Sequence, residues 1–107
     1  MSINSRLISA LSGLVAASPN RYSGSSYEYA VFDTIDTPEL FGDSSPGVIS
    51  SHVILNYYAP VEMNTVAKRK QIAEAIHAAG FTYPTSTSSG DASQQRIIYE
   101  FEGIGNG

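Results

Sequence analysis

Two histidines are the side chains of this sequence best suited to acid–base chemistry near neutral pH. His77 follows Glu74 by three residues, so a helix would place both side chains on one face. The same arrangement is common in solvated pairs near the end of a helix, where a protonated histidine is mildly stabilised. We expect this ordinary role for His77, and we expect the chain not to be an enzyme.

The other reactive residue types lack the spacing that catalysis or ligand binding requires. The chain has no cysteine, which excludes a disulfide framework, a thiolate metal site and a cysteine nucleophile. It also has no His-x-x-x-His pair, no Gly-x-Ser-x-Gly elbow and no glycine-rich phosphate loop. We therefore expect neither a metal nor a cofactor.

The composition describes one small domain with a lightly charged surface. The 107 residues have the length of a single domain, 1–107, and only 15% of them are charged. The net charge of −4 argues against a dedicated nucleic-acid-binding protein, because such proteins gather positive charge to neutralise phosphates. No apolar run approaches the roughly 20 residues that cross a bilayer, so we expect no membrane association.

The N-terminal segment is expected to form the first helix. Large apolar residues recur at helical spacing over residues 3–15, with Ile8 and Val15 on the predicted buried face, and Pro19 ends the segment. A signal peptide is the alternative interpretation, which the serines and the glycine that interrupt the apolar run disfavour.

A second helix is expected between Thr65 and Gly80. Asn64 or Thr65 would cap its first turn, and Gly80 would close it in the left-handed conformation. The apolar face predicted for this helix consists of Val66, Ile72, Ala73, Ile76 and Ala79.

Three further segments are expected to be strands, because they alternate or cluster apolar residues. They are residues 27–33, 51–60 and 95–102. The polar segments 34–51 and 84–93 are expected as loops, and the glycine-rich residues 103–107 as a tail. The economical arrangement is an α+β two-layer sandwich with two helices packed on one face of a small, mostly antiparallel sheet.

Charged residues are distributed unevenly along the chain. Residues 22–67 include no lysine or arginine, whereas Lys68, Arg69 and Lys70 come together where the second helix begins. A basic run at that position gains nothing from the helix dipole. It is either a solvated helix face or a contact for acidic residues of a neighbouring subunit.

The two polar segments supply further candidates for an interface. Leu40, Phe41 and Asp43 lie in the first segment and Asp91 in the second. An exposed aromatic such as Phe41 is a natural anchor for a partner, although it would equally pack back onto the domain's own core.

In their order along the chain these elements resemble the small tail-completion, or tail-terminator, proteins of long-tailed bacteriophages. The resemblance rests on the strand 51–60, the helix that ends in Ala-Gly-Phe at 79–81, the polar segment after it, and the closing strand 97–102 with its Tyr-Glu-Phe-Glu ending. It covers nearly the whole chain at the level of element order.

This resemblance implies a structural virion protein without catalytic residues. Such proteins are expected to form a hexameric ring at the head-proximal end of the tail tube, to stop tube polymerisation and to join the tail to the head. The implied partners are further copies of the chain, the major tail tube protein and the head–tail connector protein. DNA would pass through the ring without specific binding, and the protein would be assembled in the host cytoplasm into the virion tail.

Two other functional classes remain open from the residues alone. A small α+β ligand-binding or regulatory module has the same elements, because a fold does not define a function. It would need a concave pocket with a few convergent polar groups. A small hydrolase or transferase is the third possibility, and it would have to use His52 or His77.

Overall fold

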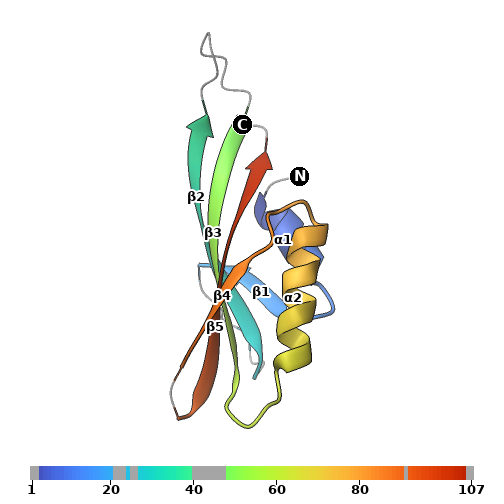
Figure 1. Ribbon diagram of the computed structural model, residues 1–107, viewed down its shortest axis with the longest axis vertical. Helices are drawn as coiled ribbons and strands as arrows, with labels where there is room; N and C mark the ends of the chain where they lie inside the picture. The colour runs from blue at the N-terminus through green and yellow to red at the C-terminus, as the bar shows by residue number, and fades with distance from the viewer. Residues whose placement is uncertain (1–2, 21–23, 25–26, 40–47, 91, 106–107) are drawn as a thin grey trace.

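The computed structural model describes residues 3–20, 24, 27–39, 48–90 and 92–105, with the backbone alone described for 36–39, 48–50 and 104–105. The elements are α1 (Ile3–Leu11), β1 (Ala16–Pro19), β2 (Tyr29–Glu39), β3 (Val48–Pro60), α2 (Val66–Ala78), β4 (Thr85–Gly90) and β5 (Gln94–Gly105). The strands form one sheet in the order β1-β2-β3-β5-β4, antiparallel except for the β1–β2 pair. Both helices pack on one face of it (Figure 1), which confirms the predicted α+β arrangement.

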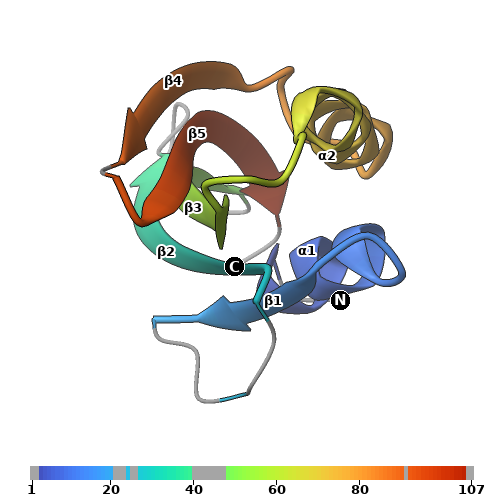
Figure 2. The same ribbon diagram turned by 90° about the horizontal axis from the view of Figure 1, so that it is seen from below.

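The core lies between this face of the sheet and the two helices. Alternate residues of the strands point inward, as the sequence pattern of β3 and β5 predicts. The largest fully buried side chains are Leu7 and Leu11 of α1, Ile72 and Ile76 of α2, and Phe32, Val53, Leu55, Tyr57 and Tyr99 of the sheet. The sheet is strongly twisted, so that α1 lies beside β1 and α2 lies on the side of β4 (Figure 2).

The first helix is shorter than the sequence predicts. α1 ends at Leu11, and Gly13 at φ +86° turns the chain toward the edge strand β1. Glycine adopts positive φ without steric cost and weakens a helix interior by about 1 kcal/mol, which explains the early end. As a result Val15 is buried, but it belongs to the segment after the helix and not to the helix itself. Ile8, which was predicted to face the core, is exposed.

The β2–β3 hairpin is longer than expected, because most of the segment predicted as a loop continues the two strands. Pairing runs from Tyr29 opposite Tyr58 to Glu39 opposite Val48. The 13 residues of β3 span about 43 Å at about 3.3 Å each, whereas the 13 residues of α2 span about 20 Å. The hairpin therefore projects beyond the helices (Figure 1).

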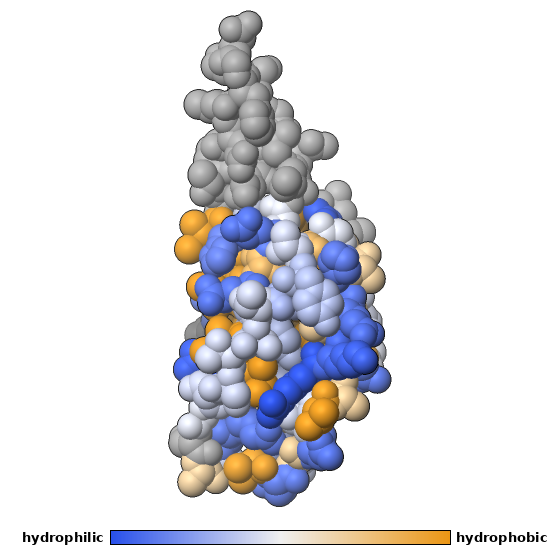
Figure 3. All heavy atoms as spheres, in the orientation of Figure 1, coloured by the Kyte–Doolittle hydropathy of each residue, from blue (hydrophilic) through white to orange (hydrophobic). Residues whose placement is uncertain are grey.

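A second predicted loop is also a strand. β4 pairs with β5 from Thr85 opposite Glu100 to Gly90 opposite Gln95, and all six of its residues are exposed. Periodicity gives no sign of this strand because it holds only Ser, Thr and Gly, and the area over it is pale in the hydropathy view (Figure 3). The β5 strand continues to Gly105, past the predicted end of the last strand.

The second helix begins and ends where the sequence predicts, but Thr65, its N-cap residue, makes no capping hydrogen bond with its side chain. The N–H of Val66 donates to Asn64 Oδ1 at 3.1 Å, and Gly80 follows the helix at φ +100°. Ile72, Ala73 and Ile76 are buried as expected. Val66 is the exception, being 72% exposed in the first turn, so it contributes little to the core.

Candidate interaction surface

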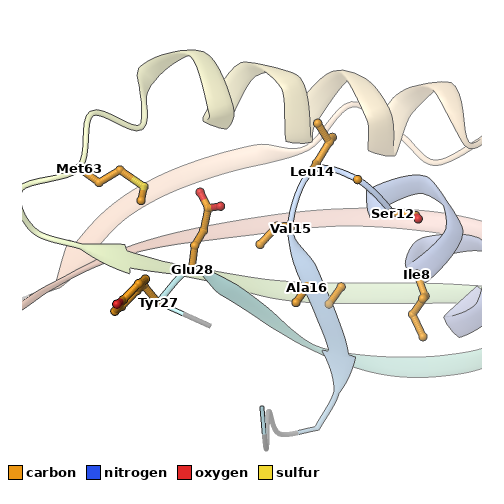
Figure 4. Close-up of a pocket in the computed structure, with 10 residues that line it drawn as sticks. Ile8, Ser12, Leu14, Val15, Ala16, Tyr27, Glu28 and Met63 are labelled. Atoms are coloured by element: carbon orange, nitrogen blue, oxygen red, sulfur yellow. The ribbon is translucent and has the colours of Figure 1, made fainter. Parts of the chain in front are cut away.

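An open groove of about 810 Å³ lies where α1 turns into β1. Its walls come from α1, the turn after it, the start of β1, the residues before β2 and the β3–α2 loop. Tyr27, Glu28 and Met63 lie on one side of β1, and Ile8 lies on the other (Figure 4). Three of these four side chains are apolar and exposed, so the groove is a surface on which another molecule would bury apolar area.

An ionic network fixes one wall of the groove. The Tyr57 hydroxyl donates to Glu28 Oε2, and Lys68 Nζ lies 3.6 Å from Glu28 Oε1. Lys68 also donates to the Leu14 carbonyl oxygen at 2.6 Å. Burial, reinforced by the Glu28 carboxylate, raises the pKa of Tyr57 far above its usual range, so its hydroxyl stays a donor. These contacts connect α2 and the turn after α1 to Glu28, the residue that precedes β2.

The predicted basic run is divided between the chain's own contacts and solvent. Lys68 belongs to the network above. Arg69 donates from Nε to Thr65 Oγ1 at 2.9 Å and from Nη2 to Gln95 Oε1 at 3.1 Å. Lys70 is 76% exposed, with its Nζ 3.9 Å from Glu74 Oε1. Lys70 is therefore the member of the run best placed to meet a neighbouring subunit, a role that stays a prediction.

Gln95 of β5 organises the loop between β3 and α2, although no sequence pattern singles it out. Its Nε2 donates to the carbonyl oxygens of Pro60 at 2.8 Å and Met63 at 2.7 Å. Its Oε1 accepts from Thr65 Oγ1 at 3.0 Å and from Arg69. The partners lie 26 to 35 residues earlier in the chain, so no local pattern reveals them.

Both histidines lie on exposed or partly exposed surface. His77 Nδ1 is 3.0 Å from the carbonyl oxygen of Phe81, while Glu74 lies beside Lys70. The ring nitrogens of His52 lie 3.4 Å from Glu100 Oε1 and 3.8 Å from Glu102 Oε1 on the neighbouring strand β5.

Within the described residues, no group of three or more His, Cys, Asp or Glu side chains is arranged to hold a metal ion. No described helix is long and apolar enough to cross a membrane.

Four of the predicted interface residues are not among those described. Leu40, Phe41 and Asp43 lie in the interval 40–47 between β2 and β3, and Asp91 lies between β4 and β5. Their role at an interface stays a prediction. Besides Gln95, the groove-lining Tyr27 and Met63 are described residues that the sequence does not single out, because no spacing rule connects elements that meet only in the folded chain.

Comparisons with known proteins bear on the fold alone. No family model and no curated protein matches the sequence. One of the solved structures that match does so with a TM-score of 0.59 and 8% sequence identity, over 99% of this chain and 97% of that chain. The name of that protein states no function. At this level of identity the similarity shows that the two chains share an overall architecture.

Proposed function

We propose that the chain is a structural virion subunit that forms a hexameric ring at the head-proximal end of a phage tail tube. There it ends tube polymerisation and joins the tail to the head connector. The observation that carries the proposal is the β2–β3 hairpin, which extends the sheet beyond both helices (Figure 1). Such an arm lets a repeating subunit reach a neighbour, the tube or the connector.

The distribution of exposed apolar side chains supports an assembly role. Tyr27 is 83% exposed, Ile35 60% and Tyr83 56%, and they belong to three separate parts of the chain. Large side chains of this kind anchor protein interfaces. A closed ring needs two different patches on each subunit, because the contact between neighbours is head to tail. Apolar residues dispersed over several surfaces suit that requirement.

Acidic side chains on the outer face of the sheet support passage of DNA without binding. Asp33, Glu100 and Glu102 are exposed there, and the strand register places Asp33 and Glu100 on either side of Ile54. Carboxylates repel a phosphate backbone, so a ring that turned this face toward its lumen would let DNA slide.

The test uses tail tubes assembled without their own terminator. We expect the purified protein to bind one end of each tube, to stop further growth, and to allow heads to attach, all of which electron microscopy measures. The free protein at high concentration should give hexameric rings in negative stain or remain able to form them on tubes. Continued tube growth with the protein left in the supernatant would rule out the proposal.

The groove supports a second candidate function, a ligand-binding module. Its volume of about 810 Å³ falls within the range of about 300–1,000 Å³ that small-molecule sites occupy. Its walls are mainly apolar, and Glu28 supplies a polar group. A thermal-shift screen with metabolites tests this candidate function. It predicts a saturable rise in Tm with at least one compound, and a screen without any such rise would contradict it.

A further inference from the structure

The edge strand β4 is unusual because it buries no side chain. All six residues of Thr85–Gly90 are exposed on both faces of the sheet, although the strand is fully paired with β5. Strands normally gain stability from side chains packed on one face and across to their neighbours. β4 gains little beyond its main-chain hydrogen bonds, so its main effect on the domain is to provide a new outer edge.

That outer edge also lacks the usual protection against pairing with another chain. Natural sheets guard exposed edges with lysines, prolines, bulges or a covering segment. β4 contains neither a charged residue nor a proline, and within the described residues no further strand pairs with it. Its side chains are those of Ser, Thr and Gly, which are small and uncharged, and the surface over this strand is pale in the hydropathy view (Figure 3).

The opposite edge of the sheet, β1, is also a short strand without a charged residue. Its last residue, Pro19, has no N–H to donate, so Ala16–Ser18 are the positions left for pairing. β1 borders the groove, whose exposed Tyr27 and Met63 stand beside it (Figure 4). The charged groups at this wall already compensate each other, since Lys68 Nζ lies 3.6 Å from Glu28 Oε1. The edge therefore offers small side chains and a neutral, partly apolar surface to an incoming strand that carries no charge.

We infer that β4 of one copy pairs with β1 of the next copy, so that the sheets of neighbouring subunits become continuous. The inference rests on the proposed function, because it names the contact through which the ring closes. Since β1 and β4 are opposite edges of one sheet, the contact is heterologous and repeats head to tail. A closed ring then leaves neither β1 nor β4 free.

The size of this contact predicts cooperative assembly. The two strands have four and six residues, and even with the groove walls this is less than the roughly 20–30 residues a side of a standard stable interface. A single contact is therefore too small to hold a dimer, but each subunit of a closed ring makes two. We expect monomers and closed rings to predominate over dimers.

Disulfide trapping tests the inference directly, because the native chain contains no cysteine. Ala16→Cys, on the exposed first residue of β1, is combined in turn with Thr87→Cys and Ser88→Cys, which sample the two faces of β4. Under mild oxidation at high concentration, at least one double variant should form a ladder of cross-linked oligomers. The two corresponding single variants, when mixed, should give mixed dimers.

The matched control pairs Ser88→Cys with Gln71→Cys, which is an exposed residue of α2 and belongs to neither edge strand. We expect its cross-linking to be at least tenfold weaker. Ser88→Cys alone should also give few dimers, because abundant homodimers would mean that β4 pairs with β4 and would overturn the inference.

The outcomes separate this inference from the proposed function. Rings seen by negative stain without a ladder in either double variant would overturn the β1–β4 contact and leave the ring itself standing. A ladder from a protein that does not cap tail tubes would keep the contact and remove the proposed function. A chain that stays monomeric at every concentration and gives no ladder would contradict the inference as well.

Discussion

Gly103 of β5 shows at the scale of one residue how closely the core packs against the sheet. A Cβ added to this buried glycine would lie 2.6 Å from Phe81 Cδ1 and 2.7 Å from Phe81 Cε1. The Phe81 ring is held in place by two neighbours. It packs edge-to-face against Phe101, with ring centroids 5.2 Å apart, and the Arg6 guanidinium lies over it. From the sequence alone Gly103 belongs to a glycine-rich tail, because its contact with Phe81 leaves no local pattern.

Gly103→Ala should therefore destabilise the protein. Overpacking of this kind costs about 1–3 kcal/mol, measured as the free energy of unfolding in urea. Phe81→Leu in the same chain should recover part of the loss caused by Gly103→Ala, because the smaller side chain frees the space. A Gly103→Ala protein as stable as the wild type would show that the ring of Phe81 moves away without cost.

A second single residue, Tyr99, makes the stability of the folded protein depend on pH. Burial raises its pKa to about 12, from a usual value near 10. Between those values the unfolded chain loses the phenolic proton while the folded chain keeps it. Stability is thus full below pH 10 and falls as the pH rises toward 12.

Tyr99→Phe should reduce this alkaline loss, although it also removes the hydrogen bond from the hydroxyl to the Arg69 carbonyl at every pH. The measurement is the urea midpoint at pH 8 and at pH 11.5 for both proteins. Tyr57, whose pKa is also raised by burial, accounts for the part of the loss that remains. An equal drop in the two proteins would contradict the assignment to Tyr99.

At the scale of elements, the sequence predicted what local chemistry determines. α2 was recognisable because its capping residues, its closing Gly80 and its buried Ile72 and Ile76 are all local signals. β4 and the outer half of the β2–β3 hairpin were not, because those segments are strands only through pairing with a partner strand. The groove could not be predicted for the same reason, because it is formed by residues of separate elements that meet only in the folded chain.

The edge strand β4 also yields a prediction that needs no cross-linking. Ser88→Lys places a long cation on the unguarded edge, which disfavours pairing with a second strand. Because the position is exposed, we expect circular dichroism and Tm to stay close to those of the wild type. Oligomer formation, measured by light scattering, should fall at least tenfold, whereas Gln71→Lys, with the same added charge on α2, should assemble normally. Normal assembly of Ser88→Lys would argue against β4 as a contact.

At the scale of the whole molecule, the projecting end of the hairpin is distinct from the helix–sheet core and is the part that the proposed function assigns to contact with partners. The described core side chains belong to residues 7–15, 30–32, 53–59, 72–81 and 97–101, all of which lie outside the segment 38–49. Stability and assembly should therefore respond to different substitutions. A variant that shortens the arm tests this separation directly.

In that variant residues 38–49 are replaced by Asn-Gly, which joins the directly opposed Thr37 and Ser50 in the two-residue turn that suits a hairpin. The described core is untouched, so we expect Tm within a few degrees of the wild type and unchanged helical circular dichroism. Binding to tail tubes, measured by co-sedimentation, should be lost or weakened at least tenfold, because the arm is the part proposed to reach a partner. If the shortened protein still caps tubes and limits their length, the arm has no role in assembly, and the contacts must lie on the edges of the sheet alone.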